Sequence, residues 1–184
     1  MKRALFLRAV QSRAARIAAT SSAARGRGNA GVVEAARGYL RGMDLSDFGT
    51  DSAARFGRTL DRHTKRLSRR LPRGAQHWGL ARKLLNIYLR DCLYCTYLNT
   101  EFHLAPAEAL FEVPLDSITA RGLKQATGCG ALPVWPGVRH LRPDVNAEFS
   151  VSRPIWLAAT ISPASTSTRC TGRWDEMNRS LRRF

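Results

Sequence analysis

The sequence has few cysteines, no long apolar run and no acidic residue near its start. Its 184 residues include four cysteines, of which only Cys92 and Cys95 are closely spaced. That arrangement is no disulfide framework, and it favours a reducing compartment. No stretch approaches the roughly 18 uncharged apolar residues that a membrane span needs. We therefore expect neither a disulfide-stapled secreted domain nor a membrane partner.

The sequence also lacks the spacing of a metal site. Cys92-x-x-Cys95 would need a second pair of ligands, and His103 and Cys129 are not arranged as one. The four histidines show no paired spacing either. Because both thiols lie within an apolar helical stretch, we expect them to pack in the core. We expect no metal and no cofactor.

Positive charge is abundant but unevenly distributed. The formal net charge of +16 divides into +7 for residues 1–33, +5 for residues 34–149 and +4 for residues 150–184. The middle segment is therefore only mildly basic. A solvated surface accounts for such a charge in many proteins, and binding to a polyanion is the alternative.

The first segment, residues 1–33, is rich in arginine, alanine and serine and resembles a mitochondrial presequence. Two other interpretations are a basic arm that contacts anions and an extension translated from a mis-set start. We expect a disordered basic arm or a mis-set start, and hence a cytoplasmic protein. The mitochondrial matrix is the alternative location.

The last segment, residues 150–184, has no helical or strand period and is crowded with serine and threonine. Read one base back, with GC-favouring codon choices, its first part becomes QRQQADLARRHDIARVHLDALYW, which has the pattern of an amphipathic helix. We therefore hypothesise that a one-base deletion near Phe149 has replaced the genuine last helix. The remaining residues would then form an irregular, exposed tail. A natural disordered tail is the alternative.

The middle segment, residues 34–149, predicts an all-α fold: a compact helical bundle around a central apolar helix. Residues 52–71 place apolar side chains at spacings of three and four, opposite a basic face. Ser46, Asp47 and Asp51 are candidate N-caps, and Asp116 is positioned to cap a later helix. The segment Trp78–Asn99 is apolar on nearly every side, so we expect it at the centre. Its expected core residues are Leu84, Leu85, Ile87, Tyr88 and Cys92.

Two short motifs resemble those of the helix-hairpin-helix DNA glycosylases. They are Gly79-Leu80-Ala81-Arg82-Lys83 at the start of the central helix and Val113-Pro114-Leu115-Asp116-Ser117 downstream. The resemblance covers about a quarter of the chain. In that superfamily a Gly-hydrophobic-Gly hairpin holds a DNA phosphate, a lysine attacks the sugar, and an aspartate supports departure of the base. The resemblance implies Lys83 as nucleophile and Asp116 as the carboxylate.

Three classes of function remain open. The first is a DNA-binding protein with DNA-repair glycosylase character. Its expected contact residues are Arg62, Lys65, Arg66, Arg69, Arg73 and Arg82. The second is a noncatalytic helical interaction domain that buries Trp135, Phe111 and Tyr97 against a protein partner. The third is a frameshifted product without present function.

Overall fold

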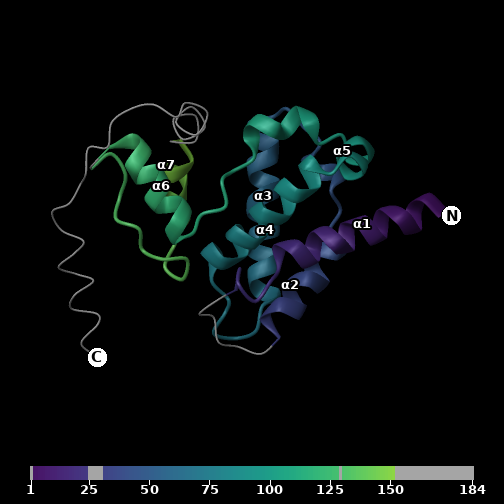
Figure 1. Cartoon of the computed structure of the whole chain (residues 1–184), viewed down its shortest axis with the longest axis horizontal. Coiled ribbons are helices and arrows are strands. Elements are labelled where there is room, and N and C mark those ends of the chain that lie inside the picture. Colours follow the sequence, from purple (N-terminus) through teal and green to yellow (C-terminus); the bar gives the residue numbers. More distant parts are fainter. Residues whose placement is uncertain (1, 25–30, 129, 152–184) are drawn as a thin grey trace.

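The structure, a computed structural model, describes residues 2–24, 31–128 and 130–151. Within these ranges all regular elements are helices, which confirms the all-α prediction. They are α1 (Lys2–Ala18), α2 (Val32–Arg41), η1 (Ser46–Phe48), α3 (Ala53–Arg70), α4 (Trp78–Tyr94), α5 (Thr96–Phe102), η2 (Ala105–Leu110), α6 (Ser117–Thr127) and α7 (Pro143–Val151). Helices α1 to α5 form a bundle, and α6 and α7 lie beside it as a smaller unit (Figure 1). Most of the segment for which we expect an irregular tail lies outside the described residues.

Helix α1 corrects the prediction that the basic N-terminal segment is a disordered arm. Residues 2–18 contain no glycine or proline, and alanine, the best helix former, recurs along them. Ala14, Ala15 and Ala18 are buried against α2 and α4. The Gln11 side chain donates a hydrogen bond to the carbonyl of Met43 at 2.6 Å. Small alanines let α1 approach closely, so the core extends beyond the expected 34–149.

Helix α4 is the central helix, as predicted, and it packs against both α1 and α3. Leu84, Leu85, Tyr88 and Cys92 are fully buried, whereas Ile87 is half-buried. The helix is shorter than expected, because the backbone becomes extended at its C-cap, Cys95, and α5 begins at Thr96.

Helix α3 is amphipathic, and a serine outside the expected set caps it. The Ser52 hydroxyl accepts the Arg55 N–H at 3.4 Å, where Asp51 had been a candidate. Ser46 and Asp47 instead lie in η1. The sequence pattern thus located the helix but placed its cap one residue early. The helix ends at its C-cap, Leu71, because Pro72 cannot continue the hydrogen-bond ladder.

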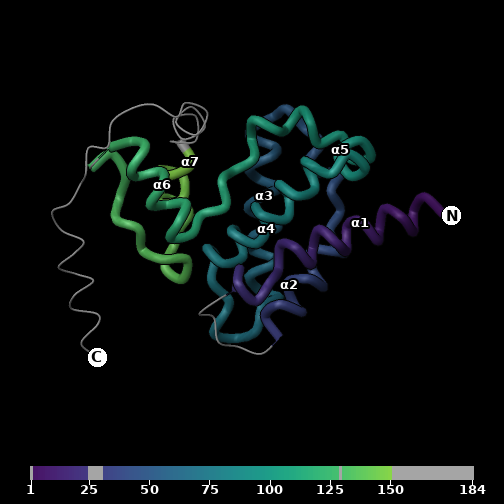
Figure 2. The backbone as a smooth tube through the Cα atoms, in the orientation of Figure 1, coloured from purple at the N-terminus to yellow at the C-terminus, as the bar shows by residue number. Residues whose placement is uncertain are grey.

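The smaller unit has an apolar cluster of its own. The chain leaves the bundle after η2 and crosses to α6 in an extended segment (Figure 2). Leu115, Ala120, Leu123, Leu132, Leu141 and Phe149 are the buried residues of this cluster. Trp135 packs against both clusters and meets the Phe149 ring edge-on at 5.7 Å between centroids. The expected single core is therefore two clusters joined by shared side chains.

Across the described ranges, no helix combines the length and apolarity needed to traverse a bilayer.

Candidate functional site

The structure brings Lys83 and Asp116 together. Lys83 lies in the second turn of α4, and Asp116 is the N-cap residue of α6. The Lys83 Nζ lies 3.4 Å from Asp116 Oδ2, and the lysine side chain is only 12% exposed. Lys83 also donates a hydrogen bond to the carbonyl of Ala23 at 3.4 Å. The pair therefore links the bundle to the smaller unit.

Asp116 uses its two carboxylate oxygens differently. Oδ1 accepts the N–H groups of Ile118 and Thr119, both at 3.0 Å, which confirms the predicted N-cap. Oδ2 faces Lys83. Burial raises the pKa of Asp116, but the Thr119 N–H and the Lys83 charge together outweigh burial and hold that pKa below its usual value. Asp116 is therefore an ionised cap in contact with an amine.

The first motif does not form a hairpin open to a phosphate. Gly79 and Ala81 lie inside the first turns of α4 and are buried. A Cβ added at Gly79 would lie 2.3 Å from the carbonyl oxygen of Val138 and 2.7 Å from the Leu141 Cβ. The close backbone approach at this glycine is therefore made by the chain itself, at the junction between the two units.

Five of the six expected DNA contacts are exposed. Arg62, Lys65, Arg66 and Arg69 lie on the outer face of α3, and Arg73 lies in the loop that follows. The Arg62 guanidinium forms an ion pair with Asp47. We call the exposed arginines and lysine of α3 the basic face; its members are Arg55, Arg58, Arg62, Lys65, Arg66, Arg69 and Arg70.

The sixth expected contact, Arg82, is buried instead, at 6% exposure. Its guanidinium stacks over the Trp78 ring, 5.1 Å from the centroid. It donates to Asp61 at 2.9 Å and to the Thr64 hydroxyl at 3.0 Å. Arg82 lies in the interior because the helix around it is apolar. It is therefore not available as a contact for DNA.

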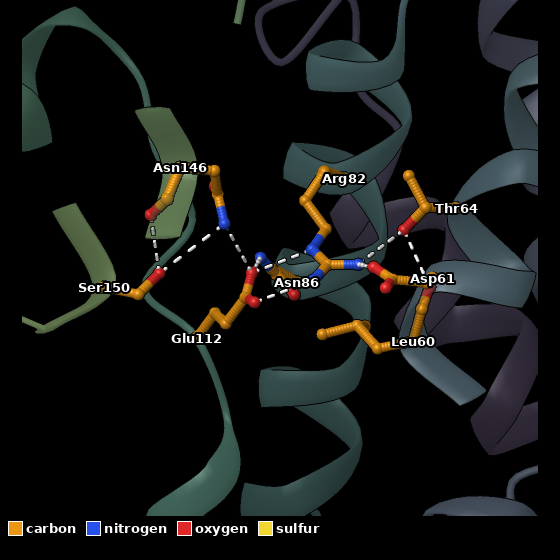
Figure 3. A network of polar contacts seen from close by, with 8 residues as sticks. All are labelled: Leu60, Asp61, Thr64, Arg82, Asn86, Glu112, Asn146 and Ser150. Atoms are coloured by element: carbon orange, nitrogen blue, oxygen red, sulfur yellow. Dashed lines mark hydrogen bonds and ion pairs between the residues drawn. The ribbon is translucent and has the colours of Figure 1, made fainter. Parts of the chain in front are cut away.

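Glu112 is the partner that holds Arg82 there, and sequence reasoning did not single it out. Arg82 Nε and Nη2 donate to the two Glu112 oxygens at 2.8 and 2.7 Å. Asn86 and Asn146 donate to the same carboxylate at 3.0 and 3.2 Å (Figure 3). Burial raises the pKa of Glu112, but the Arg82 hydrogen bonds and charge, with the asparagine bonds, lower it below its usual value.

Two sequence signals pointed toward this network. Arg82 and Asn86 are spaced by four on an otherwise apolar helix, so they share one face. Glu112 lies between Phe111 and Val113, in an apolar segment where a lone carboxylate needs a partner. Because Arg82 and Asn86 of α4 and Asn146 of α7 all donate to Glu112, the network holds these elements together.

The cysteine pair and the expected interaction residues are placed as follows. Burial raises the pKa of the Cys92 thiol, in keeping with a packed side chain. Among the described residues, no three His, Cys, Asp or Glu side chains gather where a metal could bind.

Phe111 is buried within the bundle and Trp135 is half-buried between the clusters. Only Tyr97, 60% exposed and edge-on to Phe6, is available at the surface.

Comparison with protein-family models, with curated proteins and with solved structures finds no match for this chain.

Proposed function

We propose that the protein binds DNA through the basic face of α3 in a salt-dependent manner. The observation that carries this proposal is the unequal charge of the helix. Every arginine and lysine of α3 is exposed. The one carboxylate of this helix, Asp61, instead forms an ion pair with Arg82, which lies in the interior. Asp47 pairs with Arg62, but the seven cations of the basic face still leave an excess of positive charge, which attracts the phosphates of DNA and releases their counterions.

The length of the basic face also suits DNA. Its helix has 18 residues, and at about 1.5 Å per residue it extends about 27 Å. Duplex DNA carries a negative charge every ~1.7 Å along its axis, so several phosphates lie within reach of one such helix. Arg73, exposed in the loop after α3, extends the surface at one end.

The test is the salt dependence of binding to a labelled mixed-sequence duplex, measured by fluorescence anisotropy. We expect the logarithm of the association constant to fall linearly with the logarithm of salt concentration. Arg66→Gln and Arg69→Gln should each reduce that slope by about one. Arg121→Gln, which neutralises an exposed arginine on α6, is the matched control and should leave the slope unchanged. Binding that is independent of salt would refute the proposal.

The Lys83–Asp116 contact supports a second candidate function, a DNA glycosylase with lyase activity. Loss of the Lys83 proton to solvent would leave a neutral amine, while Asp116 stays ionised and would stabilise the positive charge that develops on the sugar. That amine would attack C1′ of a damaged nucleotide, and the base would leave with the electrons of the glycosidic bond. The supporting observation is the 3.4 Å separation of the two groups.

Borohydride trapping tests this candidate. We expect a covalent protein–DNA product with a duplex that contains an abasic site, and loss of that product in Lys83→Ala. Lys83→Arg retains the positive charge beside Asp116 and therefore separates loss of the amine from loss of folding. Asp116→Asn can still cap α6 and should slow trapping. Trapping that persists in both Lys83 variants would exclude Lys83 as the nucleophile.

A further inference from the structure

An open groove of about 1010 Å³ lies between α2 and α3. Three arginines of the basic face, Arg66, Arg69 and Arg70, line it at the C-terminal end of α3. The side chains that line this groove do not include Lys83 or Asp116. The groove is therefore a separate place from the amine–carboxylate pair.

Aromatic side chains form the wall beside these arginines. Tyr39 of α2 is half-buried, and its hydroxyl is hydrogen-bonded to Nδ1 of His63 at 2.8 Å. His63 is itself buried and packs against the Phe48 ring, with 5.5 Å between centroids. The Tyr39 ring is thus fixed by a buried neighbour, so its face is ordered before any ligand arrives. An ordered aromatic ring loses little conformational freedom when a ligand binds.

The charge of the groove favours an anion at the arginine end. Two carboxylates, Asp44 and Asp47, lie on the lining as well. Asp47 is already paired with Arg62, and Asp44 accepts the backbone N–H of Ser46 at 2.9 Å. The three positive charges of the arginines therefore exceed the negative charges of these two carboxylates, one of which is already paired with Arg62. Guanidinium groups suit phosphate because they can donate two parallel hydrogen bonds.

We infer that this groove holds a nucleotide of an unpaired DNA strand, with its phosphate at the arginines and its base against Tyr39. The inference rests on the proposed DNA binding and adds a preference within it. A base inside a duplex is stacked on its neighbours and cannot lie on a tyrosine, whereas an unpaired base can. The rest of the basic face, which begins at Arg55, offers a path for adjoining phosphates of the same strand.

The experiment compares the affinity for an oligothymidylate of about twelve nucleotides with that for a duplex of the same length. At one salt concentration, we expect the wild-type protein to bind the unpaired strand about tenfold more tightly, as one stacked base would give. Tyr39→Leu should abolish this preference while leaving duplex affinity and its salt slope unchanged. Tyr94→Leu removes an exposed tyrosine outside the groove and should retain the preference.

A second variant protects the test against loss of folding. Tyr39→Phe keeps the ring and removes the hydrogen bond to His63, so it should retain most of the preference, and circular dichroism melting checks the fold of each variant. Equal affinity of the wild type for both DNAs, or a Tyr39→Leu effect on both alike, would overturn the inference. Salt-dependent duplex binding would survive that result, whereas absence of binding to either DNA would remove the proposed function itself.

Competition with free thymidine monophosphate distinguishes a strand from a lone nucleotide. The strand should compete more strongly per nucleotide, because it also reaches cations outside the groove. If the mononucleotide competes equally well per nucleotide, the groove binds a free nucleotide, and the assignment to a strand is wrong.

Discussion

At the scale of single residues, the molecule depends on Glu112, a half-buried carboxylate whose main partner, Arg82, is buried. Glu112 receives hydrogen bonds from Arg82, Asn86 and Asn146, which come from α4 and α7. A buried ion pair of this kind is costly to break, because removing one partner leaves the other charged and desolvated. Its contribution to stability is therefore best measured by the penalty for removing one charge.

Glu112→Gln keeps the size of the side chain and removes its charge, which leaves the buried Arg82 with only the largely exposed Asp61 among the two carboxylates described. We expect the free energy of unfolding to fall by about 3–5 kcal/mol. The matched control is Asp61→Asn, which alters the other carboxylate on the same arginine. Because Asp61 is largely exposed, its loss should reduce stability by no more than about 1 kcal/mol. Urea unfolding measures both; equal effects would contradict the assignment.

His63 predicts a pH dependence of stability. Burial, then the charges of Arg62 and Arg66, lower the pKa of His63, while Asp47 and Asp44 act in the opposite direction. The folded protein therefore binds a proton less readily at this site than the unfolded chain, whose histidine pKa is about 6.5. The stability that neutral His63 contributes is fully present above about pH 6.5 and is lost as the pH falls below that value.

Urea unfolding between pH 6.5 and pH 5 should accordingly show stability decreasing with acidity, by no more than about 1.4 kcal/mol per pH unit for one proton. His63→Gln should flatten this part of the profile. His140→Gln, at an exposed position, should leave the profile as it is. A profile that rises toward pH 5 in the wild type would show the opposite linkage.

At the scale of elements, the first turn of α4 is tightly packed against the smaller unit. It carries Gly79 against the loop at Val138, while Trp78 packs on the cluster of the smaller unit. Helix propensity alone would favour alanine at a helical glycine. Glycine is needed here because there is no space for a side chain.

Gly79→Ala and Gly57→Ala form a matched pair of helical substitutions. At Gly79 the added methyl group would meet a backbone oxygen at 2.3 Å. We therefore expect overpacking to lower the free energy of unfolding by about 1–3 kcal/mol. At Gly57, in α3, nothing lies within 4 Å, and alanine should stabilise the helix by about 0.5–1 kcal/mol. Thermal melting compares the two; a stabilised Gly79→Ala variant would contradict the packing described.

Helical periodicity predicted most of the elements but little of what joins them. The apolar run of α4 and the alternating faces of α3 are local patterns, so they can be identified in the sequence. The contact between Arg82 and Glu112 is not local. In the sequence Arg82 resembles a surface cation, and its partner Glu112 lies far along the chain. Lys83 and Asp116 were paired by a motif resemblance, and their proximity was not deducible from spacing.

Helix α1 was missed for a related reason. A run of arginines and alanines without acidic residues is typical of disordered arms and presequences. Its ordering depends on a complementary surface formed by α2 and α4, which composition does not describe.

At the scale of the whole molecule, two apolar clusters are joined through few side chains. Trp135 packs on both, and Glu112 bonds to Asn146 of α7. The smaller unit should therefore depend on these contacts for its order, while the bundle retains its own larger core.

Trp135→Leu should loosen α6 and α7 selectively. Removing most of the shared ring lowers the free energy of local opening there by about 2–3 kcal/mol. Hydrogen exchange measured by mass spectrometry should show faster exchange in α6 and α7 and little change in α4. Val134→Ala alters the exposed neighbouring side chain and should have no effect. Uniformly faster exchange in the Trp135 variant would indicate a single indivisible core.

The burial of α1 against α4 also sets an order of events during synthesis. From the end of α1 at residue 18 to the start of α4 at residue 78, about 60 residues must be added. At about 5–20 residues per second, the ribosome takes about 3–12 s to deliver the first turn of the partner helix. Throughout that interval the alanine face of α1 lacks α4, and the positive charge of this helix, which has no acidic residue, opposes association between nascent chains.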